Sequence, residues 1–238
     1  MSNGIRMYSA GPLSIIALIL LIGLVILMIP LIFLGLVGAA FTRLGFSWIA
    51  ALAVVLLMLF GSFVNIPLYR IRRDTIRVDN AALPFTGAGN PFSHQQAWET
   101  VVSLNLGGAL IPIAVSAYLL YRATTVLGMA VLQPVVISIV IVAVVAWLAT
   151  RSIPGYGIRA PVFMPGLVAI LCGLLLAGGA GLSAGVTAFV AGTAGTLIGA
   201  GIAQIPRIRD MEIPEVSIGG PGMFGAIFLA CILSALIA

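Results

Sequence analysis

Charged residues are scarce in this sequence, and lysine is absent. Only 7% of the 238 residues are charged, and all 11 basic residues are arginines. A soluble globular domain usually has about a quarter of its residues charged. The net charge of +5 is spread over short segments and forms no basic domain. The composition therefore excludes a soluble fold and predicts no nucleic-acid partner.

Reactive groups are also missing from the apolar segments. Without lysine there is no site for a retinal Schiff base, and a single histidine, His94, excludes a histidine pair for haem and an HExxH zinc site. The two cysteines, Cys172 and Cys231, stand alone in apolar segments, so we expect neither a disulfide framework nor a metal site. No acid lies within an apolar segment to relay protons. The sequence thus predicts a protein that is not an enzyme and that has no cofactor.

Long apolar runs make up most of the chain. Hydrophobic residues account for 62% of it, and the mean hydropathy is +1.26. A helix of about 20 apolar residues crosses the ~30 Å hydrocarbon core of a bilayer. We therefore predict an all-α, polytopic transmembrane helix bundle that forms one integral membrane domain over residues 1–238. The seven expected spans are 12–38, 47–68, 101–121, 125–149, 161–179, 183–205 and 217–238.

The arginines predict the orientation of this bundle. With seven spans, nine of the 11 arginines fall on the side that holds the N-terminus, and only Arg43 and Arg122 fall on the other. Basic residues favour the cytoplasmic side of a membrane. The N-terminus is therefore expected in the cytoplasm and the C-terminus outside, with residues 69–100 as a cytoplasmic polar loop that contains a short hairpin or lies at the interface.

Four residues with amide side chains lie within the expected spans: Asn65, Asn105, Gln133 and Gln204. In lipid, an amide side chain seeks a hydrogen-bond partner on a neighbouring helix. These residues therefore either join helices or line a site for a small solute, as broken helices do in transporters. Asn65 and Asn105 are the first candidates for such a site because each precedes a Pro or a Gly-Gly pair by two residues.

Glycines in the C-terminal third have a spacing that is typical of close helix packing. Gly181 and Gly185, and then Gly195 and Gly199, recur every four residues, which leaves a smooth helix face. The motif SIGGPG opens the last expected span. Its Gly219, Gly220 and Pro221 disfavour regular helix and predict a broken start to that span, packed on the glycine-rich sixth span.

Several blocks of this sequence resemble those of a family of prokaryotic membrane proteins, the domain of unknown function sixteen-fourteen. The blocks are GSFVNIPLYRI (61–71), LNLGGALIPIAVSAYLL (104–120), PGYGIRAPVFMPGLVAIL (154–171), AGTAGTLIGA (191–200) and SIGGPGMFGAIFL (217–229). The resemblance implies an integral protein of a prokaryotic plasma membrane. The family pattern has two aspartates in its membrane segments, and Gly201 and Gly225 stand at those positions here. The resemblance thus implies a member without these acids.

Three functions remain compatible with the sequence. The first is a non-catalytic accessory or structural subunit that lies in the bilayer and packs against a membrane-protein partner or a second copy. The second is a transporter or channel for a small neutral or weakly charged solute, with its site near Asn65 and Asn105. The third is a membrane enzyme that uses loop residues, for which the candidates are His94, Glu99, Asp210, Glu212 and Glu215.

Overall fold

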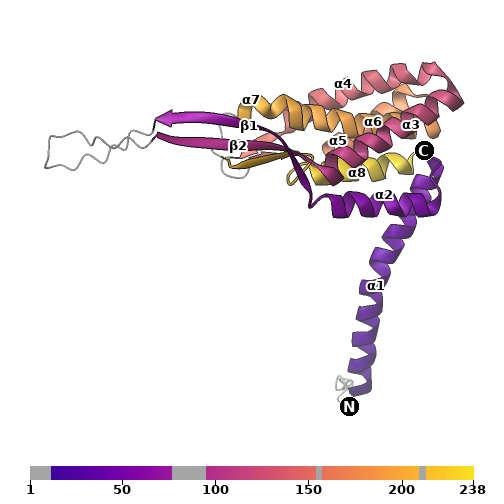
Figure 1. Cartoon of the computed structure of the whole chain (residues 1–238). Coiled ribbons are helices and arrows are strands. Elements are labelled where there is room, and N and C mark those ends of the chain that lie inside the picture. The colour runs from indigo at the N-terminus through magenta and orange to yellow at the C-terminus, as the bar shows by residue number, and fades with distance from the viewer. Residues whose placement is uncertain (1–11, 77–94, 154–156, 209–212) are drawn as a thin grey trace, which may run out of the picture.

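The computed structural model of the chain describes residues 12–76, 95–153, 157–208 and 213–238, and these residues are mostly helical. The helices form a bundle from which a two-stranded ribbon extends at one end (Figure 1). The α-helices are α1 (Pro12–Arg43), α2 (Trp48–Gly61), α3 (Ile111–Leu127), α4 (Leu132–Ala149), α5 (Met164–Leu176), α6 (Leu182–Val190), α7 (Ile205–Ile208) and α8 (Phe224–Leu236).

Short turns of other helical types join several of these helices. A π-helical turn, Leu106–Leu110, leads into α3, and a 3₁₀ turn, Met129–Val131, leads into α4. Two more π-helical turns, Ala191–Gly195 and Leu197–Gly201, and a 3₁₀ turn, Ile202–Gln204, connect α6 to α7. The stretch Leu182–Arg207 is therefore one long apolar helical segment, which we call the central segment.

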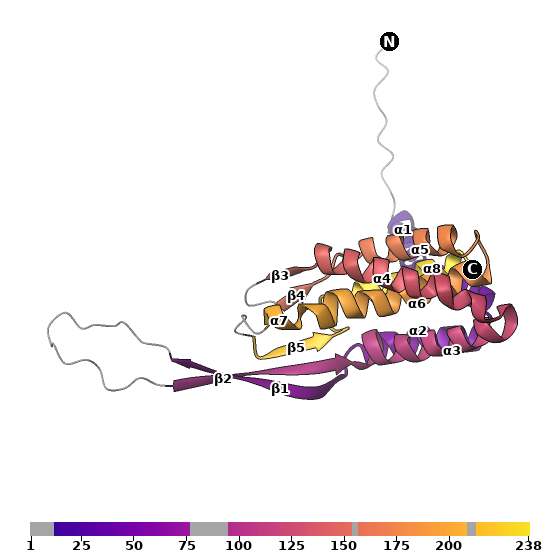
Figure 2. The ribbon, with the colours of Figure 1, turned by 90° about the horizontal axis from the view of Figure 1, so that it is seen from above.

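The strands form two small sheets at the same end of the bundle. The strands are β1 (Asn65–Ile76), β2 (Gln95–Asn105), β3 (Arg151–Ile153), β4 (Gly157–Arg159) and β5 (Glu215–Ile218). In the first sheet, of order β1-β2-β5, β2 runs antiparallel to β1 and parallel to β5. The second sheet is the antiparallel hairpin β3-β4. Figure 2 shows β3, β4, β5 and α7 together, beside the base of the β1-β2 ribbon.

The seven expected spans correspond to seven apolar helical segments in the described part of the chain. Four of them are long and apolar enough to cross a membrane: Ile15–Arg43, Leu106–Leu127, Met129–Ala149 and Leu182–Arg207. The other three are α2, α5 and α8, of 14, 13 and 13 residues. The chain thus has the helices of a membrane protein, while the number of spans and the orientation stay predictions.

Three expected spans are wrong at one end, because their apolar runs continue into strands. The span 47–68 ends as a helix at Gly61, and Asn65 already starts β1. The span 101–121 begins in β2, and the span 217–238 begins in β5 and a turn before α8 starts at Phe224. The chain is therefore not all-α. The expected polar loop 69–100 contains paired arms of the ribbon in its described parts, 69–76 and 95–100.

The connections alternate between the two ends of the bundle. Those that follow α2, α4 and α7 carry all the strands and lie at one end (Figures 1 and 2). The sequence-based argument placed these three connections on one side. Of the arginines that the structure describes, six belong to this end: Arg70, Arg72, Arg73, Arg151, Arg159 and Arg207.

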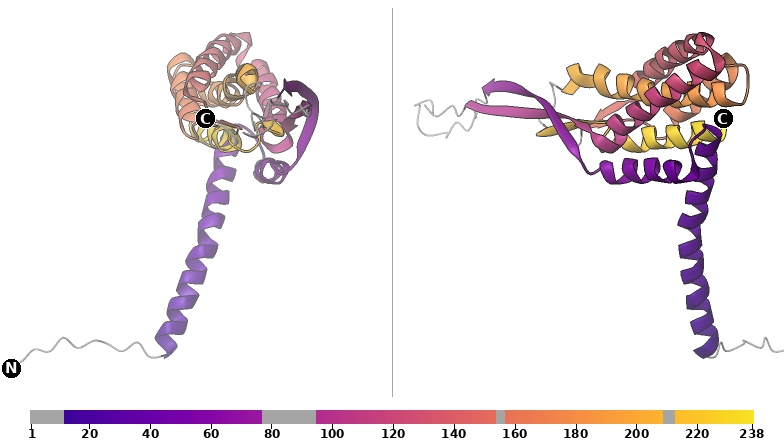
Figure 3. Two further views of the ribbon diagram at one scale, coloured as in Figure 1. Left: turned by 90° about the vertical axis from the view of Figure 1, so that its left-hand side faces the viewer. Right: turned by 45° about the vertical axis from the view of Figure 1, so that its right-hand side comes forward.

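Helix α1 differs from the other helices, because it lies crosswise to them and extends away from one end of the bundle (Figure 3). It contacts α2 and α8 near its C-terminal end, where Val37, Ala40, Phe41 and Leu44 are buried. From Ile15 to Ile32 every residue of α1 is exposed. In the described part of the chain, α1 is thus buried only at its C-terminal end, and its place among the expected spans stays a prediction.

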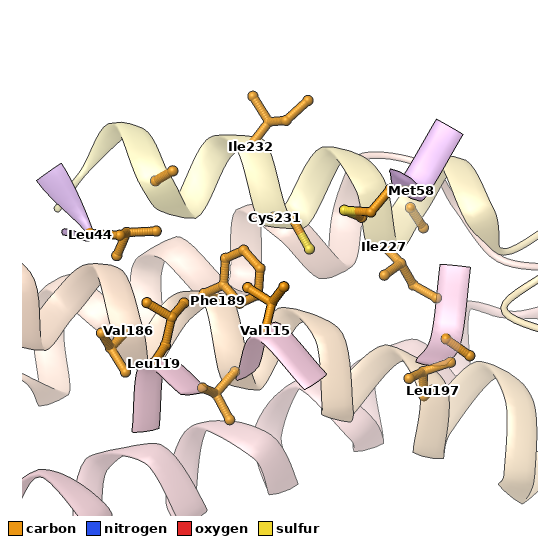
Figure 4. Packing of buried hydrophobic residues seen from close by; sticks show 14 of the residues in the cluster. Leu44, Met58, Val115, Leu119, Val186, Phe189, Leu197, Ile227, Cys231 and Ile232 are labelled. Carbon is orange, nitrogen blue, oxygen red and sulfur yellow. The ribbon is translucent and has the colours of Figure 1, made fainter. Parts of the chain in front are cut away.

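The core of the bundle surrounds the central segment. Phe189 is fully buried there and meets Phe41 of α1 edge to face, with ring centroids 6.0 Å apart. Figure 4 shows Phe189 among Val115 and Leu119 of α3 and Cys231 of α8. Aromatic rings favour this T-shaped geometry. These side chains pack the central segment against α1, α3 and α8.

Candidate functional site

Asn105 ends β2 and caps the π-helical turn that leads into α3. Its side-chain oxygen accepts a hydrogen bond from the backbone N–H of Gly108 at 2.7 Å, as an N-cap asparagine does. Its side-chain nitrogen donates to the carbonyl of Ser62 at 2.7 Å and to Oδ1 of Asn65 at 2.9 Å. Asn105 is fully buried, so it ties the strand end, the helix start and the first ribbon residue together.

Asn65 and Ser217 complete this polar cluster, which we call the polar junction: Asn65, Asn105 and Ser217. The side-chain oxygen of Asn65 accepts from Asn105 and also from the hydroxyl of Ser217 at 2.7 Å. The three residues come from β1, β2 and β5. The sequence paired Asn65 with Asn105, and the structure joins them by a hydrogen bond. The sequence analysis did not predict Ser217 as their partner.

Two further contacts hold β5 beside β2. The hydroxyl of Ser103, on a fully buried residue, donates to Oε1 of Glu215 at 2.8 Å. The hydroxyl of Thr100 donates to the carbonyl of Ile213 at 2.7 Å. Sequence reasoning placed Glu215 among loop acids and missed its contact with Ser103. The alternation of polar and apolar residues in EVSI (215–218) was the available signal for a strand.

A small cavity of about 160 Å³ opens beside the polar junction. Asn65, Ser217 and Glu215 supply its polar lining, and Met223 lies among its apolar residues. A second hollow of about 400 Å³, which includes Arg159, shares Gly157, Ile158 and Pro221 with it. The cavity has room for a few water molecules or a small solute. An amide, a hydroxyl and a carboxylate can hydrogen-bond to such a solute.

The described residues offer little for catalysis at this site. They contain no group of three or more His, Cys, Asp or Glu side chains that could hold a metal ion. Among the described residues, Glu215 is the one acid that lines the cavity. Three candidates from the loops, His94, Asp210 and Glu212, lie outside the described residues, and Glu99 forms ion pairs with Arg70 and Arg72 on the ribbon.

The other two predicted polar residues lie elsewhere. Gln133 lines a hollow at the opposite end of α4, together with Leu176 and Ser183. Gln204 is buried in the central segment, donates to the carbonyl of Trp147 at 3.0 Å and accepts from Arg207 at 2.9 Å. The predicted set of four amides is thus divided among three places.

The predicted packing glycines occupy two kinds of position. A Cβ on Gly185 would overlap Ala238, one on Gly195 would lie 2.7 Å from Val142, and one on Gly199 would overlap the carbonyl of Ala143. A Cβ on Gly181 would meet nothing within 4 Å, and the φ of +129° puts this residue in a conformation that favours glycine, just before α6. Its backbone N–H donates to the carbonyl of Ile237, after α8, at 3.0 Å. Gly181 therefore precedes the first residue of α6, and its place in a packing face stays a prediction.

The SIGGPG motif is a turn between a strand and a helix. Its Ser and Ile end β5, Gly219 and Gly220 follow, and α8 begins after Pro221, Gly222 and Met223. Gly219 has φ of +78°, and a Cβ on Gly108 would overlap its carbonyl oxygen. The close approach of these two backbones presses the turn against the start of α3.

Gly201 and Gly225, the positions at which the resemblance implies aspartates in the family pattern, lie beside this turn. A Cβ on Gly201 would lie 3.0 Å from Ile218 and 3.7 Å from the sulfur of Met223. A Cβ on Gly225 would lie 3.6 Å from Val162. Gly201 therefore faces the turn that leads from the polar junction into α8, and Gly225 lies at the first turn of α8.

Comparison with known proteins identifies the family but not a function. No curated protein and no solved structure matches the chain. A family described as "Protein of unknown function (DUF1614)" matches residues 59–237, which cover most of the seven apolar segments and the whole polar junction. The chain therefore belongs to the DUF1614 family.

Proposed function

We propose that this membrane protein is a non-catalytic accessory or structural subunit, which acts by contact with another protein in a prokaryotic plasma membrane. The observation that carries this proposal is the β1-β2 ribbon. Its strands pair from Asn65↔Asn105 to Ile76↔Gln95, and 12 residues of β1 at about 3.3 Å each give this strand a length of roughly 40 Å, of which the part beyond β5 projects from the bundle. An element of this reach is suited to contact with a neighbour.

The ribbon has a free edge that a partner strand can extend. β1 is the outer strand of its sheet, and an outer strand presents backbone N–H and C=O groups for pairing. A β-bulge at Leu68 separates Pro67 from Tyr69 in the register. Ile66 and Leu68 are exposed there, and Phe63, just before the strand, is 84% exposed. Beyond the residues that pair with β5 the ribbon has only two strands, and a two-stranded ribbon is only marginally stable, so a partner would also stabilise it.

Ion pairs connect the two strands near the middle of the ribbon. Nε of Arg72 lies 2.7 Å from Oε1 of Glu99, and Arg70 lies 3.4 Å from its Oε2. All three side chains are substantially exposed, so the pairs contribute little to stability. The ion pairs favour one pairing register of β1 and β2. Their charged groups follow the apolar residues Ile66 and Leu68 along the ribbon.

Purification from the native membrane in a mild detergent, followed by mass spectrometry, tests this proposal. The ribbon variant carries Ile66→Ser and Leu68→Ser, and the control carries Leu171→Ser and Leu175→Ser on the exposed face of α5. We expect one protein, in constant ratio, to accompany the wild type and the control but not the ribbon variant. Wild-type chain that purifies alone, or a companion that the ribbon variant retains, contradicts the proposal.

A second function, transport of a small neutral solute, is favoured by the polar junction and its cavity. The uncharged groups of Asn65 and Ser217 face a space of about 160 Å³ at the end of the bundle. Uptake into liposomes that contain the protein tests this candidate with a panel of small neutral solutes. Transport requires that Asn65→Ala lowers uptake at least several-fold while Gln133→Ala, in a separate hollow, does not. Equal uptake by all proteins excludes it.

A further inference from the structure

The β3-β4 hairpin holds two arginines directly opposite each other. Arg151 of β3 pairs with Arg159 of β4 in the antiparallel register, and both residues are exposed. Side chains in such a pair lie about 5 Å apart at Cβ, and like charges there destabilise a hairpin. In the described part of the chain, the ion pairs involve Arg70 and Arg72, not these two arginines. A bound anion would remove the repulsion.

The two arginines border a hollow whose other lining is apolar. The hollow has a volume of about 660 Å³ and lies between the end of α4 and the start of α5. Its lining consists of Leu148, Ala149, Arg151, Ile153, Arg159, Ala160, Pro161, Val162 and Met164. A site with a doubly positive rim and an apolar wall fits a ligand that has an anionic head and a hydrocarbon tail.

The position of the hollow along α4 matches the headgroup level of a bilayer. The apolar segment Met129–Ala149 ends two residues before Arg151. Trp147 is partly exposed just inside this limit, and the guanidinium of Arg207 lies 5.7 Å from its ring centroid. Tryptophan and arginine are typical of the interface between lipid and water. Figure 2 shows the hairpin beyond the ends of α4 and α5.

The apolar wall continues along surfaces that face outward. On α4, Val144 lies one helical turn before Leu148, and both are exposed. On α5, Leu167 follows Met164 by three residues, and both are exposed. Residues three or four apart share a helix face. A hydrocarbon chain that starts in the hollow can therefore follow these side chains toward the middle of the membrane.

We infer that this hollow binds an anionic phospholipid, whose phosphate lies between Arg151 and Arg159 and whose acyl chain lies against Leu148 and Met164. Guanidinium groups bind phosphate oxygens through paired, charge-assisted hydrogen bonds. The apolar wall favours a lipid over free phosphate, because free phosphate has no hydrocarbon chain to contact this wall. The site is separate from the ribbon, so this inference goes beyond the proposed function and does not depend on it.

Lipid binding by the full chain in detergent tests the inference. Native mass spectrometry counts bound phosphatidylglycerol or phosphatidylcholine, and thermal unfolding measures the stabilisation by each lipid. We expect the wild type to favour phosphatidylglycerol. We expect Arg151→Gln with Arg159→Gln to weaken this binding by on the order of tenfold, since each arginine near an anionic lipid contributes measurably. The control, Arg70→Gln with Arg72→Gln, removes the same charge from the ribbon and should retain binding.

Several outcomes overturn the inference. One is a wild type that binds both lipids equally, a result that requires no variant and so holds even if the double variant does not fold. Another is an equal loss in the control, which indicates unspecific attraction. Displacement of phosphatidylglycerol by excess inorganic phosphate indicates a phosphate site without a role for the tail. Without lipid, the double variant should unfold at the same temperature as the wild type or higher, because it removes a like-charge pair.

Discussion

Helix α1 and the central segment are both long and apolar, yet they lie in opposite surroundings. α1 has 32 residues, and the most apolar part of it has no buried residue. The central segment has 26 residues, and 78% of its most apolar part is buried inside the bundle. Leucine and isoleucine dominate α1, whereas glycine, alanine and threonine dominate the central segment.

The difference teaches that size, more than hydrophobicity, decides which helix is inside. In a soluble protein the larger apolar side chains are buried, because water excludes them. In lipid the tails are as apolar as leucine, so this force is absent and close backbone contact determines packing. Gly195 and Gly199 let the central segment lie directly against Val142 and Ala143 of α4. The large side chains of α1 are free to face lipid or another chain.

The largest expected effect comes from Phe189, the exception in the small-residue segment. Phe189→Ala would leave a cavity between α1, α3 and α8 and should lower the free energy of unfolding by about 3–5 kcal/mol. Its counterpart in α1, Ile19→Ala, removes a side chain that is 62% exposed and should cost less than about 1 kcal/mol. Unfolding curves in detergent micelles measure both values.

If the two variants lose equal stability, then α1 is as tightly packed as the centre of the bundle. That result would contradict the comparison. It would show that another surface covers α1 in the detergent-solubilised protein, and size-exclusion chromatography coupled to light scattering would then identify a second copy.

A glycine in each segment sharpens the comparison, because the same substitution should act in opposite directions. Gly199→Ala puts a methyl group onto the carbonyl of Ala143, which forces two backbones apart and should cost about 1–3 kcal/mol. Gly23→Ala in α1 meets nothing within 4 Å and should be neutral or stabilise the helix by up to about 1 kcal/mol. The unfolding temperatures of the two variants should therefore differ in sign relative to the wild type. A gain at both positions would refute the close contact at Gly199.

The approximate places of the helices could be predicted from the sequence, because each apolar helix lies mostly within one expected span, although Ile15–Arg43 and Leu106–Leu127 extend past the ends of theirs. The ends of the helices could not be predicted in this way. Apolar composition alone does not distinguish a buried strand from a helix. The mostly apolar runs VVSLN (101–105) and SFVNIPL (62–68) are therefore compatible with either conformation. Pro67, which removes a backbone donor, was a local signal against a helix at that point. The direction of α1 depends on a few contacts at Phe41 and Leu44, which no periodicity encodes.

The candidate site was predictable to a similar degree. Asn65 and Asn105 stood out because each precedes a residue that interrupts a helix, and the structure brings them into contact. Ser217 lies 152 residues from Asn65 in the chain and reaches it through the parallel pairing of β5 with β2. Such long-range pairing leaves no trace in a local pattern. The Ser103–Glu215 contact depends on the same pairing.

The smallest expected effect separates packing from hydrogen bonding in the central segment. The hydroxyl of Thr193 contacts the sulfur of Cys231 on α8 at 3.5 Å, and the residue is fully buried. Thr193→Val keeps the shape and removes this contact, and it should cost only about 0.6 kcal/mol, the average for such bonds between membrane helices. Thr193→Leu adds volume at the same point and should cost about 1–3 kcal/mol. Thr193→Val could instead lower the free energy of unfolding more than Thr193→Leu does in the same measurement. Polar contacts, and not small side chains, would then hold the central segment in place and explain its contrast with α1.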